Sequence, residues 1–205
     1  SCDANGLDTI TSTFQTKYQG EREGFVVKLL EKDSTKPVAM TYFGTPQYDQ
    51  VYFLDLDNDG RVYIAGQTNG TIQRTSGTYG KDDTKQFIAA FGGDLDTLVF
   101  STTFGNRLTN PELSPSAFMV DNCYHIYYSG WGSTVDPAAN RGTTEGLEIS
   151  LDAIVSTTDS NDFYLLVLSP FATKLLHATY FGGTSTDDHV DGGTSRFDKG
   201  GVVYQ

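Results

Sequence analysis

Three short sequence patterns recur in the same order along the 205 residues. The first joins an aspartate, a turn and an apolar run; the second is an apolar run led by phenylalanine in most copies; the third ends in Phe-Gly. The first pattern occupies 57–66, 121–130 and 198–205. The second occupies 24–29, 86–91 and 162–168, and the third occupies 41–44, 102–105 and 179–182. Agreement of three patterns in order and spacing indicates an internal repeat far more strongly than any single match.

Each pattern predicts a β-strand. The runs are rich in β-branched and aromatic residues and are bounded by glycine or Asp-Gly, as between Asp59 and Gly66. A repeat of about 60 to 77 residues accommodates four short strands with their loops. Four consecutive antiparallel strands make a propeller blade. We therefore predict an all-β protein, a β-propeller fragment of about three four-stranded antiparallel blades belonging to a larger propeller.

The pattern positions give one partial propeller domain over 1–205. We expect the end of one blade at 1–45, complete blades at 46–105 and 106–183, and the start of the next blade at 184–205. Because propellers usually close with about four to eight blades, we expect further blades outside this sequence.

The turns of the first pattern differ between repeats. Asp59-Gly60 predicts a two-residue hairpin turn, because glycine takes a positive φ easily, and Gly200-Gly201 predicts the same. Cys123-Tyr124 suits that turn poorly, so a different turn is expected in the middle repeat. A short helical turn is expected around 147–153, at the end of the longest connection.

The charge of the chain excludes some partners. It has 14 basic and 26 acidic residues, a net charge of −12 and no basic cluster. Nucleic acid requires clustered Lys or Arg, so it is not expected as a partner. No apolar run approaches the roughly 20 residues of a membrane span, so no membrane insertion is expected.

The two cysteines, Cys2 and Cys123, could form a disulfide with each other or with cysteines elsewhere.

Asp55, Asp57 and Asp59 are candidate metal ligands. Together with Gly60 they resemble the first half of a calcium loop, which makes calcium the one cofactor considered. The acidic residue that completes such a loop is missing, because position 66 is glycine. The alternative is a hairpin turn whose aspartates accept hydrogen bonds from backbone N–H groups. The other two repeats lack the three aspartates, which favours this alternative.

Four residues are candidate ligand contacts. His189 and Asp191 lie in the densest polar cluster, at the expected start of an innermost strand near the central channel, where metal binding, acid–base chemistry or a structural network would each suit them. Trp131 is a candidate stacking platform for a sugar, with packing between blades as the alternative. Asp49 is the carboxylate that would pair with Asp191 if the propeller were an enzyme acting on polysaccharides.

The repeated patterns resemble the bacterial β-propeller repeat family SBBP. The likeness extends from about residue 13 to 205 and rests on Tyr-Phe-Gly-Gly at 180–183, on Asp-x-x-Gly-x-Val-Tyr-x-x-Gly at 57–66 and on the apolar strand that follows. Segments 114–118, 128–132 and 189–198 resemble a version found in large cell-surface proteins of the Bacteroidota. Such proteins often carry immunoglobulin-like modules and a gliding-motility-associated C-terminal domain for type IX secretion.

The resemblance implies an extracellular location at the outer cell surface and offers no agreed catalytic residues. We therefore expect a non-enzymatic binding or adhesion module whose partners are other domains of the same long chain, polysaccharide, or surface and secretion-machinery proteins. A polysaccharide-active enzyme on a propeller scaffold and a purely structural spacer or assembly platform are the alternatives. Thr9, Ser34 and Thr97 lie in a short O-glycosylation pattern of exported Bacteroidota proteins, which predicts a glycoprotein.

Overall fold

The fold is built from antiparallel strands. The computed structural model describes residues 13–132, 142–185, 188, 196–200 and 202–204. In these residues the helical content is one short 3-10 turn, η2 (Pro170–Ala172). The all-β prediction is therefore confirmed.

The described strands are mostly six to eight residues long. They are β1 (Gly24–Leu30), β2 (Asp33–Phe43), β3 (Asp49–Leu56), β4 (Val62–Thr68), β5 (Gln86–Phe91), β6 (Leu98–Phe104), β7 (Ser114–Val120), β8 (Ile126–Trp131), β9 (Phe163–Leu168), β10 (Leu175–Phe181), β11 (Arg196–Phe197) and β12 (Val203–Tyr204).

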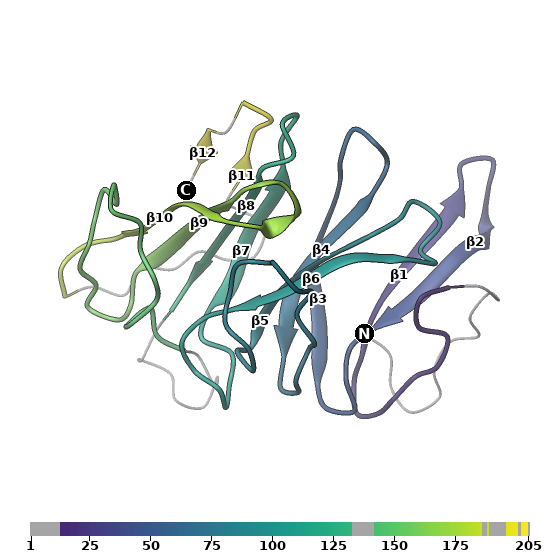
Figure 1. Ribbon diagram of the computed structural model, residues 1–205, viewed down its shortest axis with the longest axis horizontal. Coiled ribbons are helices and arrows are strands. Elements are labelled where there is room, and N and C mark those ends of the chain that lie inside the picture. Colours follow the sequence, from purple (N-terminus) through teal and green to yellow (C-terminus); the bar gives the residue numbers. More distant parts are fainter. Residues whose placement is uncertain (1–12, 133–141, 186–187, 189–195, 201, 205) are drawn as a thin grey trace.

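The strands form sheets in simple chain order. Two four-stranded sheets, β3-β4-β5-β6 and β7-β8-β9-β10, lie side by side, with the hairpins β1-β2 and β11-β12 next to them (Figure 1). All pairs are antiparallel, and each strand pairs with its neighbour in sequence. A four-stranded antiparallel meander is the unit of a propeller blade. The arrangement is that of a β-propeller fragment.

The loop around residues 147–153 is not helical, contrary to expectation. It contains one turn, in which the Ala153 N–H donates to the Ser150 carbonyl at 3.1 Å, and two of its other carbonyls accept hydrogen bonds from tyrosine hydroxyls. The hydroxyl of Tyr180 donates to the carbonyl of Leu147 at 2.9 Å, and that of Tyr164 donates to the carbonyl of Glu148 at 2.6 Å. The two tyrosine contacts attach the start of the loop to β9 and β10.

Hairpins β3-β4 and β7-β8 have the same type of turn. This corrects the predicted two-residue turn at Asp59-Gly60 and the different turn predicted for the middle repeat. In the first, the Gly60 N–H donates to the Asp57 carbonyl at 3.1 Å with Gly60 at φ +77°. In the second, the Tyr124 N–H donates to the Asp121 carbonyl at 3.0 Å with Tyr124 at φ +67°. The turn is thus longer than the predicted two-residue turn, and Tyr124 takes the left-handed conformation that glycine takes in the other hairpin.

Two apolar cores lie on the two faces of the sheet β3-β4-β5-β6. Because side chains alternate along a strand, Phe87 and Phe91 of β5 enter the core shared with β1-β2. Ile88 and Ala90 enter the core shared with β7-β10. All four are fully buried. Burying a large apolar side chain contributes about 1.5–3 kcal/mol, so this packing fixes the stacking of successive sheets.

The first strands of successive sheets meet, with β3 against β7 and β7 against β11. Asp55 of β3 accepts a hydrogen bond from the Val120 N–H of β7 at 2.8 Å. The Lys199 ammonium donates to Asp55 at 2.9 Å and to the Val120 carbonyl at 2.6 Å. One carboxylate and one ammonium therefore connect three successive sheets.

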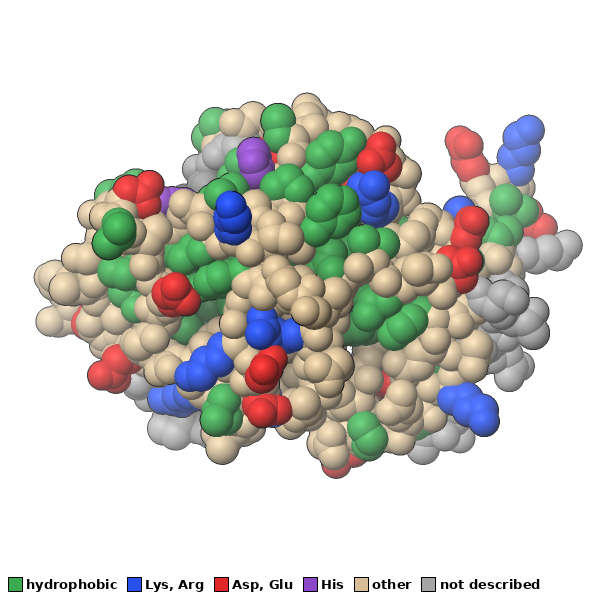
Figure 2. Space-filling view, viewed as in Figure 1, with side chains coloured by type: hydrophobic (Ala, Val, Ile, Leu, Met, Phe, Trp, Pro, Cys, Tyr) green, Lys and Arg blue, Asp and Glu red, His purple; other side chains and the backbone are tan. Residues whose placement is uncertain are grey.

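The surface mixes charges of both signs. Figure 2 shows acidic and basic side chains interspersed over one face of the molecule.

Among the residues described, no helix has the length and apolar character needed to cross a membrane.

Candidate functional site

The three aspartates of the predicted calcium loop are held by three different sets of partners. Asp57 accepts the N–H groups of Asp59 and Arg61, each at 2.9 Å, and its other oxygen contacts the Arg61 guanidinium at 2.9 Å. Asp59 also pairs with Arg61, whereas Asp55 binds the neighbouring sheets. In the described part of the chain no group of three or more His, Cys, Asp or Glu is arranged to hold a metal. We therefore do not propose a calcium site here.

The Asp57 arrangement recurs in the other hairpins. The Asp121 carboxylate accepts the N–H groups of Cys123 and His125 at 2.8 Å, and Asp198 accepts those of Gly200 and Val202 at 2.8 and 3.0 Å. Burial acts to raise the pKa of Asp121, but the hydrogen bonds from His125 and Cys123 outweigh it and lower the pKa overall. These aspartates organise the turns, as the alternative reading of the sequence had it.

Asp49 belongs to a second repeated arrangement, in which a carboxylate holds the loop after each Phe-Gly. Its carboxylate accepts the Thr45 N–H at 2.6 Å. Glu112 accepts the N–H groups of Asn106 and Arg107 at 2.5 and 2.8 Å, and Asp188 accepts that of Gly183 at 2.6 Å. The carboxylate lies directly over the glycine: a Cβ on Gly44 would stand 2.6 Å from an Asp49 oxygen. This close approach explains the glycine of the Phe-Gly pattern.

Burial shifts the protonation of these carboxyl groups. Asp49 is fully buried, and burial raises its pKa to about 6, although hydrogen bonds from Thr68 and Thr45 act to lower it. Burial likewise raises the pKa of Glu112, against hydrogen bonds from Asn106 and Arg107. The prediction that Asp49 contacts a ligand is not tested by these contacts, which serve the loop.

The remaining predicted residues are scattered. Trp131 ends β8 and is 7% exposed, which suits the alternative of packing between blades better than an open stacking platform. Cys123 and Thr97 are both exposed, which for Thr97 is the accessibility that a glycan requires. Ser34 lies on β2, and nothing is described of its side chain. Cys2, Thr9, His189 and Asp191 lie outside the described residues.

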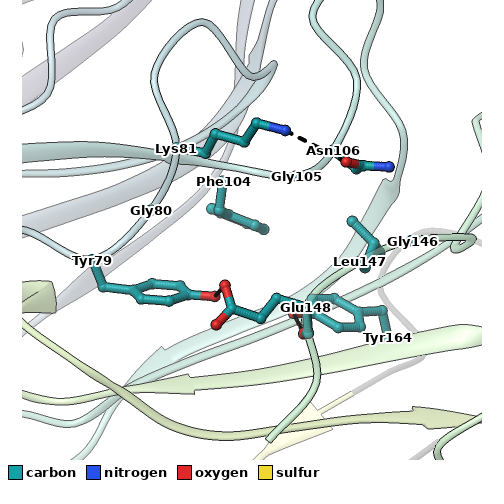
Figure 3. Close-up of a pocket in the computed structure, with 10 residues that line it drawn as sticks. All are labelled: Tyr79, Gly80, Lys81, Phe104, Gly105, Asn106, Gly146, Leu147, Glu148 and Tyr164. Carbon is teal, nitrogen blue, oxygen red and sulfur yellow. Dashed lines mark hydrogen bonds between the residues drawn. The ribbon is translucent and has the colours of Figure 1, made fainter.

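A pocket opens where the sheet β3-β6 meets the sheet β7-β10. This junction pocket is formed by residues 79–81, 104–106, 146–148 and Tyr164 and has a volume of about 190 Å³ (Figure 3). Phe104, Leu147 and Tyr164 are buried. The side chains of residues 81, 106 and 148 are exposed. The pocket thus has an apolar base and a polar rim, supplied by two successive sheets.

The polar groups of the junction pocket are oriented by one another. The Tyr79 hydroxyl donates to the Glu148 carboxylate at 2.8 Å, and the Lys81 ammonium lies 3.5 Å from the Asn106 amide oxygen (Figure 3). Burial, with the hydrogen bond to Glu148 and its charge, raises the pKa of Tyr79 well above its ordinary value. Tyr79 therefore remains a hydrogen-bond donor at neutral pH.

The same pocket recurs one blade earlier. This equivalent hollow has a volume of about 270 Å³ and includes Gln15, Phe43, Gly44 and residues 71–73. Phe43-Gly44 and Phe104-Gly105 are copies of one pattern. The carbonyls of Gln15 and Tyr79 both accept a hydroxyl bond from the threonine two residues before that phenylalanine.

The loop that closes each pocket is also equivalent. The Thr75 N–H donates to the Ser101 carbonyl at 2.8 Å, and the Ser150 N–H donates to the Ala178 carbonyl at 3.0 Å. Counting back from these bonds, Ile72 matches Leu147 and Gln73 matches Glu148. Two apolar walls, the phenylalanine of Phe-Gly and the aliphatic residue of the closing loop, are therefore shared by the two pockets, whereas Tyr79 and Glu148 stand in place of two glutamines. Tyr164 has no counterpart in the equivalent hollow, which is lined by Phe14 and Leu98 instead.

Comparison with known families agrees with this repeat. Residues 40–72, which run from the end of β2 through β3 and β4, match the family model SBBP, described as a beta-propeller repeat. No curated protein matches the chain.

Sequence reasoning did not find the junction pocket. Its residues come from four separate segments, of which only Phe104-Gly105 and Tyr164 belong to recurring patterns. The signal that was available is the variation around that pattern: the segments before β5 and β9 carry Tyr79-Gly80-Lys81 and Gly146-Leu147-Glu148, and they differ between repeats.

Proposed function

We propose that the chain is an extracellular, non-enzymatic binding module that holds a ligand between successive blades. The observation that carries the proposal is the recurrence of one cavity at two sheet junctions, with two shared apolar walls and different polar side chains. Loops that only filled space between the sheets would need only the apolar walls. Polar groups that change on a constant framework are what recognition requires.

The setting of the pocket supports a rigid binding site. Its walls come from strands packed on both faces, and its loops are tied to those strands by hydrogen bonds such as Ser150 to Ala178. Side chains held in advance lose less freedom when a ligand binds. A propeller therefore suits repeated recognition of a surface or a polymer.

Two observations support a module without catalytic activity. The Asp49 carboxylate, the candidate for acid–base work, is enclosed by Thr45 and Thr68. The carboxylate of Glu148 is bound to Tyr79, whose hydroxyl stays protonated.

The resemblance to large Bacteroidota surface proteins supports a further part of the proposal. The module would lie at the outer cell surface, within a chain exported by type IX secretion and used in adhesion or gliding motility. Labelling of intact cells with an antibody to this chain tests the location. Staining that appears only after the cells are broken open would contradict it.

A binding assay tests the function itself. The 205-residue chain is applied to an array of glycans and surface proteins, beside the variants Asn106→Trp, which fills the rim of the junction pocket, and Gln73→Trp, which does the same in the equivalent hollow. We expect at least one ligand whose binding is lost in Asn106→Trp and kept in Gln73→Trp. An array without any bound ligand would refute the proposal.

A further inference from the structure

The junction pocket has charges of opposite sign on its rim. Lys81 and Asn106 lie on one side, and Tyr79 and Glu148 lie on the other, with Phe104 between them (Figure 3). Among the described residues no carboxylate lies within ion-pair distance of Lys81, although its charge acts on the buried Glu112 from further away, and its hydrogen bond to Asn106 is long, at 3.5 Å. Its ammonium is therefore available to an anionic group of a ligand.

The opposite side of the pocket is an acceptor. The Glu148 carboxylate has one oxygen bound by the Tyr79 hydroxyl at 2.8 Å. A carboxylate has about four lone-pair sites, so further sites remain for donors such as vicinal hydroxyls. The hydrogen bond from Tyr79 fixes the orientation of the Glu148 carboxylate before a ligand binds.

The size and the base of the pocket restrict the ligand. The volume of about 190 Å³ lies below the roughly 300–1,000 Å³ of drug-sized sites, so the pocket holds one small ring or one unit of a polymer. The buried side chains of Phe104 and Leu147 offer an apolar patch to the carbon face of such a ring. The openness of the rim leaves the rest of a polymer free to continue outside.

We propose that the junction pocket binds a pyranose ring bearing a carboxylate, such as a uronic acid unit of an acidic polysaccharide. Lys81 pairs with the sugar carboxylate, Asn106 donates to it from its amide, and Glu148 accepts the ring hydroxyls. This inference rests on the proposed binding function and names the ligand class of the same site.

The equivalent hollow provides the internal comparison. Gln15 and Gln73 stand there in the places of Tyr79 and Glu148. Lys17 lies two residues after Gln15, as Lys81 lies two residues after Tyr79, so the two lysines match in sequence position. Both lysines are exposed. Lys17→Gln is therefore a matched control for Lys81→Gln, with the same charge change at the corresponding place of the preceding repeat.

The test measures binding of trigalacturonic acid and of neutral galactotriose to the 205-residue chain by calorimetry. We expect the trigalacturonate affinity to fall about tenfold or more in Lys81→Gln and to stay unchanged in Lys17→Gln. Glu148→Ala should weaken both sugars, because the hydroxyls are common to them. Thermal melting of each variant verifies that it folds.

The other outcomes separate the two proposals. If galactotriose binds as tightly as trigalacturonate and Lys81→Gln has no effect, the acidic-sugar inference is overturned and the binding function stands. Equal losses in Lys81→Gln and Lys17→Gln would show unspecific attraction and would also overturn the inference. If neither sugar binds, and the array of the preceding section is empty too, both proposals fail.

Discussion

Buried carboxyl groups are the residues that most affect the response of this molecule to pH. Asp49 and Glu112 each bind the backbone of a loop after Phe-Gly, and both have raised pKa values because they are buried. Glu23, beside Gln15 and Gln19, is also fully buried with a raised pKa from the same cause. Their charged forms are therefore less favourable in the folded protein than in the unfolded chain.

Asp49 gives a prediction with a definite sign. Its pKa is about 6 in the folded protein and about 3.9 in an unfolded chain, so the folded state binds more protons between these values. The free energy of unfolding should therefore fall as pH rises from about 4 to about 6, by about 2–3 kcal/mol from this group. Urea unfolding of the protein and of Asp49→Asn across this range measures the effect. The variant should lose less stability as pH rises; parallel curves would contradict the prediction.

Tyr124 offers a test of backbone strain. Its φ of +67° lies in the left-handed region, which costs residues other than glycine about 1–2 kcal/mol. Tyr124→Gly and Tyr124→Ala both remove the ring, which lies near the Arg61 guanidinium. We expect the glycine variant to be more stable than the alanine variant by about 1 kcal/mol, measured by chemical denaturation. An alanine variant of equal or greater stability would show that the turn does not impose this conformation.

At the scale of elements, the first hairpin of each sheet depends on one aspartate. Asp57, Asp121 and Asp198 accept backbone N–H groups two and four residues ahead. Asp57 is the most enclosed of them in its turn, with a side chain that is 0% exposed. Its loss would leave two backbone donors and the Arg61 guanidinium without this acceptor.

We therefore expect Asp57→Ala to lower the free energy of unfolding by about 2 kcal/mol. Asp59→Ala is the matched control in the same turn, since Asp59 is half exposed and its carboxylate contacts only side chains, the Arg61 guanidinium and the Tyr124 hydroxyl, among the residues described. It should cost less than about 1 kcal/mol. Thermal or urea unfolding of both variants provides the measurement. A larger loss in Asp59→Ala would contradict this account of the turn.

At the scale of the whole molecule, the sheets are joined by two apolar cores and by polar contacts between their first strands. Asp55 is the centre of those polar contacts, since it binds both the Val120 N–H and the Lys199 ammonium. The contacts cross between sheets, so they affect how the sheets are arranged more than how any one sheet forms.

Asp55→Ala should lower the free energy of unfolding by about 1–2 kcal/mol, because a buried N–H and a lysine lose a charged acceptor. Asp96→Ala changes an exposed aspartate in the β5-β6 turn and serves as the control. Hydrogen exchange of the Val120 amide, followed by NMR, should quicken in Asp55→Ala alone. Unchanged exchange would show that Asp55 does not hold the two sheets together.

The fold class followed from local information. Alternating apolar residues, β-branched strands and Asp-x-x-Gly turns are read over a few residues, and their recurrence predicts four-stranded antiparallel sheets. The turn aspartates were foreseen as an alternative to calcium for the same reason. The Tyr124 turn was missed, because a local preference of about 1–2 kcal/mol is smaller than the combined contacts that impose the same hairpin in both sheets.

The sequence by itself thus determined the strands, their order and the repeat, because these depend on the periodicity of neighbouring residues. Only the tertiary structure decided the junction pocket. Lys81, Phe104 and Glu148 are separated by tens of residues and meet when two sheets stack face to face. Packing where β1-β2 meets β3-β6 likewise buries Asp49 and raises its pKa, a property that depends on the surrounding atoms.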